Sequence, residues 1–399
     1  MVEQNPRSSP RAFALFAYGF RPFFWAAGLF ATLGVIAWLW IYTVGARTLR
    51  DLPPQLWHGH EMLYGFVGAA IGGFLLTAVP SWTGARGFAG VPLIALTAVW
   101  VAGRLAFASA SILPFSVVAV CELAFLPGLA VLIAPPLLRG RNRNTRLLWV
   151  LAGLWIADLL FLIALARGEV LLARRTLLVA IDIVLLLTTI IGGRIIPAFT
   201  ATALRIRGAA ANMRGSPWVD AIVIGAMAGV ALADACAPWG TMAGGIAALA
   251  AVAQGWRFAG WRSLSTAGEP LVWSLHLAYA WLPVGLTLKA IHLLTGAAWS
   301  AQWLHALTIG AASSMILAVM SRAALGHTGR ALLASRPIAI AYVLLCLAAL
   351  VRVFAPSLMA VDYRLTVMVA GALWVAAFGL FMLVYTPILM RSRIDARPG

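Results

Sequence analysis

Long apolar runs separated by short polar connections dominate the chain. The run from Met62 to Val79 carries no charged residue and is long enough to cross a bilayer as a helix. Similar runs recur to the C-terminus and predict about twelve transmembrane helices. Their expected bounds are 23–44, 60–80, 91–110, 112–134, 146–166, 176–197, 218–236, 240–256, 271–294, 301–321, 336–355 and 365–387. We expect an all-α membrane protein, because a spanning helix satisfies its own backbone hydrogen bonds.

Composition supports this class. Of 399 residues, 63% are hydrophobic and only 10% are charged, and the mean hydropathy is +0.95. A soluble domain is about a quarter charged. The net charge of +17 is therefore explained by basic loops beside anionic lipid, and we expect membrane lipid rather than nucleic acid as a partner. Cys121, Cys236 and Cys346 stand singly in apolar runs, which favours core positions over a disulfide or a Cys-x-x-Cys metal site.

Basic connections predict the orientation. One side of the predicted membrane collects nineteen arginines and the other seven, so both termini are expected in the cytoplasm. The richer side includes Arg21, Arg86, Arg139 and Arg391, and the poorer side includes Arg47 and Arg364. No small-residue cleavage site precedes the first apolar run, and we expect no cleaved signal peptide.

A weak internal repeat indicates the architecture. The pattern H-x4-G-x17-TG begins at His60 and again at His305, and Trp25, Trp149 and Trp273 are equally spaced near the starts of three spans. Repeats at a fixed interval predict three four-helix units, at 20–140, 141–262 and 263–390, in a pseudo-threefold bundle. Shared turn chemistry in glycine-rich membrane helices is the alternative explanation.

Histidines at the mouth of the second span are the strongest candidates for chemistry. The segment WHGHE places His58, His60 and Glu61 beside hydrocarbon, where charge is costly without a bound partner. Imidazole is a common ligand of haem iron and copper. If spans two and ten are neighbours, His60 and His305 could face one another across a haem, and His58 could serve a second metal. The alternative is that these side chains sit in interfacial water.

Two further histidines are expected near the cytoplasmic face. His276 lies in SLHLAYAWLP and His327 in LGHTGR, and both are candidate cofactor and metal ligands. His327 could instead only shape a helix-ending turn. His292 is expected to be an interfacial residue without a metal.

Charged residues within spans form a second set of candidates. Arg104 and Arg194 are expected to bind haem propionates through bidentate hydrogen bonds. Glu122 is a candidate proton carrier, because burial favours the protonated form of a carboxyl group. With His58 and Glu61 it makes the candidate catalytic set. Asp158 and Asp182 are interpreted as structural ion pairs.

Several sequence blocks resemble the NnrS family of membrane proteins. They are GFRPFF (19–24), WHGHEMLYGF (57–66), FLLTAVPSWTG (74–84), GGRIIPAFT (192–200), HLAYAWLPVG (276–285) and HALTIGAASSMILAVMSRAALGHTGR (305–330). The resemblance implies a bacterial inner-membrane protein with haem (expected as haem b) and copper, linked to defence against nitric oxide. The family's histidines map onto His58, His60, His276, His305 and His327, without assigning a metal to each.

The expected function is the binding, and conceivably the reduction, of nitric oxide by haem and copper, with an unidentified electron donor. Whether the chain is a nitric oxide reductase-like oxidoreductase stays open at this point. The plan is similar to that of the main subunit of haem-copper oxidases, but their further histidine ligands have no counterpart here, which puts oxygen reduction in doubt. The alternatives are a transporter or metal or haem carrier, and a non-catalytic sensor or metal-homeostasis protein.

Overall fold

Helices make up 83% of the residues that the structure describes. The computed structural model describes residues 14–45, 52–139, 142–209, 215–358 and 361–395, and these ranges contain no strand. The helices are α1 Phe20–Val44, α2 Pro54–His60, η2 Glu61–Val67, α3 Gly68–Thr83, α4 Val91–Ala108, α5 Phe115–Leu123, α6 Phe125–Arg139, η3 Arg143–Arg146, α7 Leu147–Ala166, α8 Val170–Ile206, α9 Pro217–Cys236, α10 Thr241–Ala259, η4 Ser263–Thr266, α11 Pro270–Thr295, η5 Ala298–Ser300, α12 Trp303–His305, η6 Ala306–Ser313, α13 Ser314–His327, α14 Arg336–Leu358 and α15 Tyr363–Met390. The all-α prediction is confirmed.

The predicted membrane spans are present. Within the described ranges, eleven helical stretches are long and apolar enough to cross a membrane. The eighth predicted span is α10, a 19-residue helix that packs between α9 and α11 and completes the set. This is a multi-pass membrane protein. The prediction of cytoplasmic termini rests partly on residues 1–13 and 396–399, which lie outside the described residues.

Two of the predicted span ends fell at a proline that does not end its helix. Pro80 lies inside α3, which continues to Thr83, and Pro197 lies inside α8, which continues to Ile206. Proline usually ends a helix in water. In a membrane-type bundle neighbouring helices and Ser or Thr side chains satisfy the backbone groups that proline frees, so the helix continues.

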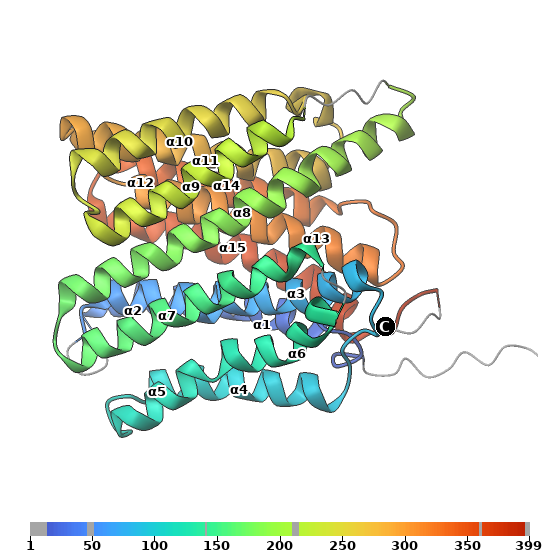
Figure 1. Ribbon diagram of the computed structural model, residues 1–399, viewed down its shortest axis with the longest axis horizontal. Coiled ribbons are helices and arrows are strands. Elements are labelled where there is room, and N and C mark those ends of the chain that lie inside the picture. Colours follow the sequence, from blue (N-terminus) through green and yellow to red (C-terminus); the bar gives the residue numbers. More distant parts are fainter. Residues whose placement is uncertain (1–13, 46–51, 140–141, 210–214, 359–360, 396–399) are drawn as a thin grey trace, which may run out of the picture.

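Helices adjacent in sequence pack side by side, and α15 packs on α1. Figure 1 shows α8 crossing the middle of the bundle. The segment η2 contacts α8, η6 contacts α8 as well, and α3 contacts α13, so the second, sixth and tenth spans meet at the centre. The division into three four-helix units stays a prediction. We call the end of the bundle where α1 leads to α2 the α1–α2 end, and the opposite end the α3–α4 end.

The sequence repeat corresponds to a repeated backbone. His60 ends α2 and His305 ends α12, and a π-helical segment follows each of them directly. Each span then ends at a glycine with positive φ, 69° at Gly84 and 71° at Gly329. π-Helical segments are rare and occur mostly at functional sites. The two segments therefore direct attention to the two histidines that precede them.

Candidate functional site

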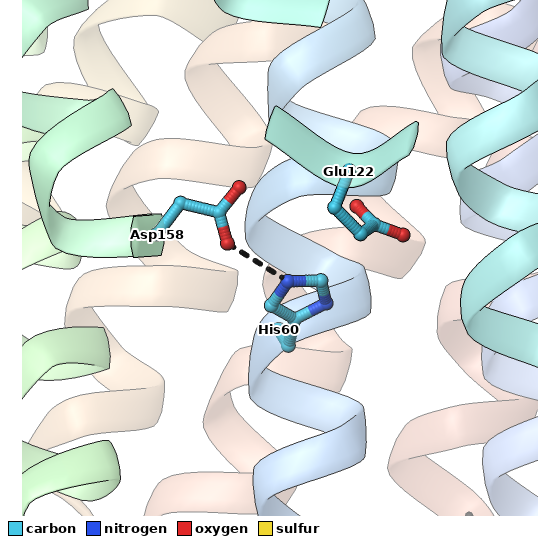
Figure 2. A group of neighbouring side chains, drawn as sticks. All are labelled: His60, Glu122 and Asp158. Atoms are coloured by element: carbon cyan, nitrogen blue, oxygen red, sulfur yellow. Dashed lines mark hydrogen bonds and ion pairs between the residues drawn. The ribbon is translucent and has the colours of Figure 1, made fainter. Parts of the chain in front are cut away.

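His60 is held between two carboxylates. Its Nδ1 lies 3.1 Å from Glu61 Oε1 and its Nε2 lies 3.1 Å from Asp158 Oδ1. The ring is fully buried and stacks against Phe107 and Phe161, with centroid distances of 4.1 and 4.8 Å. Figure 2 shows His60, Asp158 and Glu122 converging from three different helices. Apolar stacking above and below leaves only the ring edge for polar contacts.

Both ring nitrogens of His60 are occupied by this arrangement. A neutral imidazole has one N–H and can donate to only one carboxylate, whereas a doubly protonated ring donates to both. Glu61 and Asp158 therefore favour the imidazolium form. A metal bond at His60 would require one of the two hydrogen bonds to break.

Arg104 extends the cluster to a third carboxylate, that of Glu122. Its Nη1 donates to Glu61 Oε1 at 2.5 Å, and its Nη2 pairs with Glu122 Oε2. Glu122 is 4% exposed, and its other oxygen, Oε1, has no hydrogen-bond partner. Arg104 is thus occupied by carboxylates in this arrangement, and its role as a propionate ligand stays a prediction.

Three side chains of this cluster are close enough to hold one cation. His60, Glu122 and Asp158 each offer a ligand atom, and these atoms lie within 4.8 Å of one another. With Glu61 and Arg104 the group contains three carboxylates, a guanidinium and an imidazole, all buried. Such a group is costly inside a membrane bundle unless its charges compensate one another. It can bind a proton or a metal cation, and it is the largest concentration of charge that the described residues form.

His58 and His305 form a second group at the α1–α2 end. The ring of His58 stacks on Trp38 with a centroid distance of 4.5 Å, and its Nδ1 is buried without a hydrogen-bond partner. His305 lies within electrostatic range of His58 and of Arg352. Arg352 itself donates to Gln302 Oε1 at 2.9 Å and to the Tyr363 hydroxyl at 2.6 Å. His305 thus lies within electrostatic range of His58, whereas the predicted pairing of His60 with His305 across a haem stays a prediction.

His276 lies in a network of neutral groups at the α3–α4 end. Its Nε2 is 2.7 Å from the Thr200 hydroxyl and its Nδ1 is 2.9 Å from the Ser263 hydroxyl. One turn further into the helix, Tyr279 hydrogen-bonds to Gln254 and accepts from Arg257. Both nitrogens of His276 have hydroxyl partners, which fits a structural polar network. Its role as a ligand stays a prediction.

His327 and Arg194 line one cavity at the same end. The cavity has a volume of about 360 Å³, and its other lining residues include Phe74, Trp82 and Asn144. Arg194 donates to Asn144 Oδ1 at 2.6 Å. The cavity thus combines an imidazole, a guanidinium and two aromatic walls, a set that can hold an amphipathic anion. Both residues were predicted from the sequence, and the structure places them together.

The prediction that His292 is an interfacial residue without a metal stays a prediction. His292 is half-buried near the end of α11, and its Nδ1 lies 3.2 Å from the carbonyl oxygen of Ala297. Asp158 was interpreted as part of a structural ion pair, and it does pair, with His60.

Asp182, also interpreted from the sequence as part of a structural ion pair, lies in a buried group with Asp234 and Lys289 that sequence reasoning did not find as a group. Lys289 pairs with Asp234, and the pair is completely buried. A signal was available, because Lys289 is the only lysine among 29 basic residues and it falls within a predicted span.

Comparison with known proteins agrees with the sequence blocks quoted above. No curated protein matches the chain. The family described as "NnrS protein" matches residues 14–393, which is nearly the whole chain. The chain belongs to the NnrS family.

Proposed function

We propose that this membrane protein binds haem b and copper and binds nitric oxide at a metal group held by His58 and His305, protecting the cell against nitrosative stress. The observation that carries the proposal is the buried Nδ1 of His58, which has no hydrogen-bond partner and lies in a group with His305. Membership of the NnrS family supports the choice of cofactors.

The residues at the α1–α2 end fit a metal group. A buried ring nitrogen without a partner costs about 1–3 kcal/mol, and a metal bond would remove that cost. Trp38 fixes the plane of the His58 ring. Imidazole nitrogen suits both haem iron and copper. When bound, the reduced metal supplies the electron density that binds nitric oxide. Arg352 adds a fixed positive charge that favours electron-rich ligands and carboxylates there.

The His60 cluster would serve proton movement rather than metal binding in this proposal. Reduction of nitric oxide consumes protons as well as electrons. Glu122 has an oxygen without a partner, and it lies beside Arg104 in a group rich in carboxylates. We assign Glu122 the role of binding a proton. Arg104 orients the Glu122 side chain, and Glu61 in turn orients Arg104. Electrons come from a donor outside this chain.

A second cofactor position is the cavity at the α3–α4 end. His327 offers an imidazole, Arg194 offers a guanidinium for a carboxylate, and Phe74 and Trp82 offer aromatic walls. These groups fit a haem with its propionates better than they fit a bare copper ion, because copper needs no aromatic walls. We therefore expect haem at this cavity to require both His327 and Arg194.

The protein would work in the bacterial inner membrane with both termini in the cytoplasm. That orientation places the α1–α2 end, with His58 and His305, toward the periplasm. Nitric oxide dissolves in lipid, so it could reach this end without crossing a charged barrier. Reporter fusions after Ile394 that are active only on the periplasmic side would contradict the orientation.

The test is the metal content and the spectrum of the purified protein. We expect iron and copper, a reduced-minus-oxidised haem spectrum, and a change in that spectrum on adding nitric oxide. His58→Ala and His305→Ala should each lose the same metal, while His292→Ala, a histidine at the same end with a backbone partner, should keep it. Equal metal content in all three variants would contradict the assignment.

A carrier of metal or haem is the second candidate, favoured by the departure from α-helical geometry at η2 and η6 in two central spans. Irregular helices near the centre of a bundle also form the binding sites of transporters. A gently purified protein that holds neither iron nor copper, and yet protects cells from nitric oxide, would support the carrier.

A further inference from the structure

A second buried charged group lies outside the histidine sites. Lys289 of α11, Asp234 of α9 and Asp182 of α8 are each at most 1% exposed. The ammonium of Lys289 pairs with Asp234 Oδ2. Asp182 lies within hydrogen-bonding range of Asp234. Three helices thus bring two carboxyl groups and one ammonium group together inside the bundle.

The charges of this group do not balance without one more positive charge. Two carboxylates and one ammonium leave a net charge of minus one, which is costly in a membrane bundle. Both oxygens of Asp182 and Oδ1 of Asp234 also lack a hydrogen-bond donor. Two carboxyl groups in contact are stable when one of them carries a proton, because like charges at that distance repel strongly. One proton therefore supplies both the missing charge and the missing donor.

We propose that Asp182 and Asp234 form a site that binds and releases one proton, with Lys289 as its fixed counter-charge. The reaction is the protonation of a carboxylate oxygen, and it breaks no other bond. The charged groups that act on Asp182 are Asp234 from α9 and Lys289 from α11. The site does not depend on the proposed binding of nitric oxide.

The choice of lysine fits this role. An ammonium is a compact charge that pairs with one carboxylate, whereas a guanidinium could pair with both through its planar fork and leave no place for a proton. Lys289 is the only lysine in the chain, against 28 arginines. Its Nζ also lies 4.9 Å from the ring centroid of Trp303, which keeps it beside the carboxylates.

The carboxyl pair lies near one of the candidate metal ligands. Trp303 belongs to α12, the short helix that ends at His305. The carboxyl pair therefore lies toward the α1–α2 end, next to the segment that carries a candidate metal ligand. A group there that exchanges one proton could pass protons along the centre of the bundle.

Infrared spectroscopy of protein containing carboxyl-labelled aspartate tests the proposal. The labelled wild-type protein should show the C=O stretch of a protonated, buried aspartic acid, and transfer to heavy water should shift that band. Asp182→Asn should remove the band, because the amide replaces the proton as a donor and preserves the shape of the side chain. Asp234→Asn should remove it too, because Asp182 then pairs with Lys289 as a carboxylate.

Two further variants make the expected pattern specific. Lys289→Met should keep or strengthen the band, because the carboxyl pair then has no counter-charge. Asp362→Asn, at the exposed N-cap of α15, should leave the band unchanged. A band that persists in Asp182→Asn and Asp234→Asn, or that never shifts in heavy water, would overturn the proposal. Loss of the band when sodium is added at constant pH would mean that the site binds a sodium ion in place of the proton, and would overturn the proposal as well.

Discussion

The segments that follow His60 and His305 have the same backbone and different chemistry. Each histidine ends a helical stretch, precedes a π-helical segment, and belongs to a span that ends at a glycine with positive φ. The ring of His60 faces two carboxylates, whereas His305 lies near another histidine and an arginine. Equal positions in a repeat therefore do not imply equal roles.

The difference arises from the helices that surround each segment. Asp158 on α7, and Arg104 and Glu122 on α4 and α5, surround His60. His305 instead lies in range of Arg352 on α14 and His58 on α2. The two repeated segments share a backbone conformation. The residues on neighbouring helices differ, and they determine what each histidine can bind. The first segment is suited to charge, and the second to a metal.

The largest expected effect separates the two histidines by metal content. We expect His305→Gln to lose most of the metal that it shares with His58, and His60→Gln to keep it. Glutamine preserves an N–H donor for Asp158 or Glu61 but is a poor ligand for haem iron and copper. The measurement is iron and copper per folded protein. Equal losses in both variants would restore the predicted pairing of His60 with His305.

Removal of Arg104, the α4 arginine that contacts Glu61 of the first segment, should destabilise the protein most. Arg104→Met leaves Glu61 and Glu122 as buried charges without a guanidinium, and loss of one partner of a buried pair costs about 3–5 kcal/mol. The control is Arg167→Met, which removes an arginine that is 66% exposed and 4.0 Å from Glu169. An exposed pair contributes only about 0–1 kcal/mol. Thermal unfolding in detergent measures the stability of both variants. Equal losses of stability would mean that Arg104 contributes no more to stability than an exposed arginine does.

The shared backbone predicts equal responses at the two glycines. A Cβ on Gly65 would overlap the ring of Phe30, and a Cβ on Gly310 would overlap the indole of Trp281. Gly65→Ala and Gly310→Ala should each cost about 1–3 kcal/mol, as overpacking usually does. Gly379→Ala in α15 has open space at this position and should be neutral or stabilising. A loss of stability at only one of the two glycines would show that the two repeated segments do not depend equally on close packing at this position.

Hydropathy was sufficient to predict the eleven long apolar helical stretches found within the described ranges, because membrane helices must carry long apolar runs whatever their neighbours are. It could not place the span ends at Pro80 and Pro197, where tertiary packing overrides the usual effect of proline. The repeat from His60 and His305 was readable because its glycines and histidines keep a fixed spacing. That spacing could not reveal the π-helical backbone, nor that the two glycines lie against Phe30 and Trp281.

The candidate residues were predictable as a set but not as pairs. A charged residue within a span is a signal in itself, so Arg104, Glu122 and Asp158 were found. Their partners come from helices far apart in sequence, and the sequence alone could not show that Asp158 would contact His60. For the same reason the pairing of Lys289 with Asp234 was missed.

The smallest effect tests a hydrogen bond that distinguishes the first segment. Trp100 Nε1 donates to the carbonyl oxygen of Gly65 at 3.2 Å, inside η2. A π-helical turn leaves carbonyl groups poorly paired, so a donor from α4 stabilises it. Trp100→Phe keeps the aromatic contact with Phe30 and removes the donor. We expect the free energy of unfolding to fall by about 1 kcal/mol, the usual net value of one hydrogen bond. The control Trp149→Phe, at a side chain that is 79% exposed, should leave it unchanged.

Amide hydrogen exchange should rise at residues 61–67 in Trp100→Phe and stay constant at 306–313. A rise in both segments would mean that the two π-helical turns open together, and that the bond to Trp100 is not specific to the first.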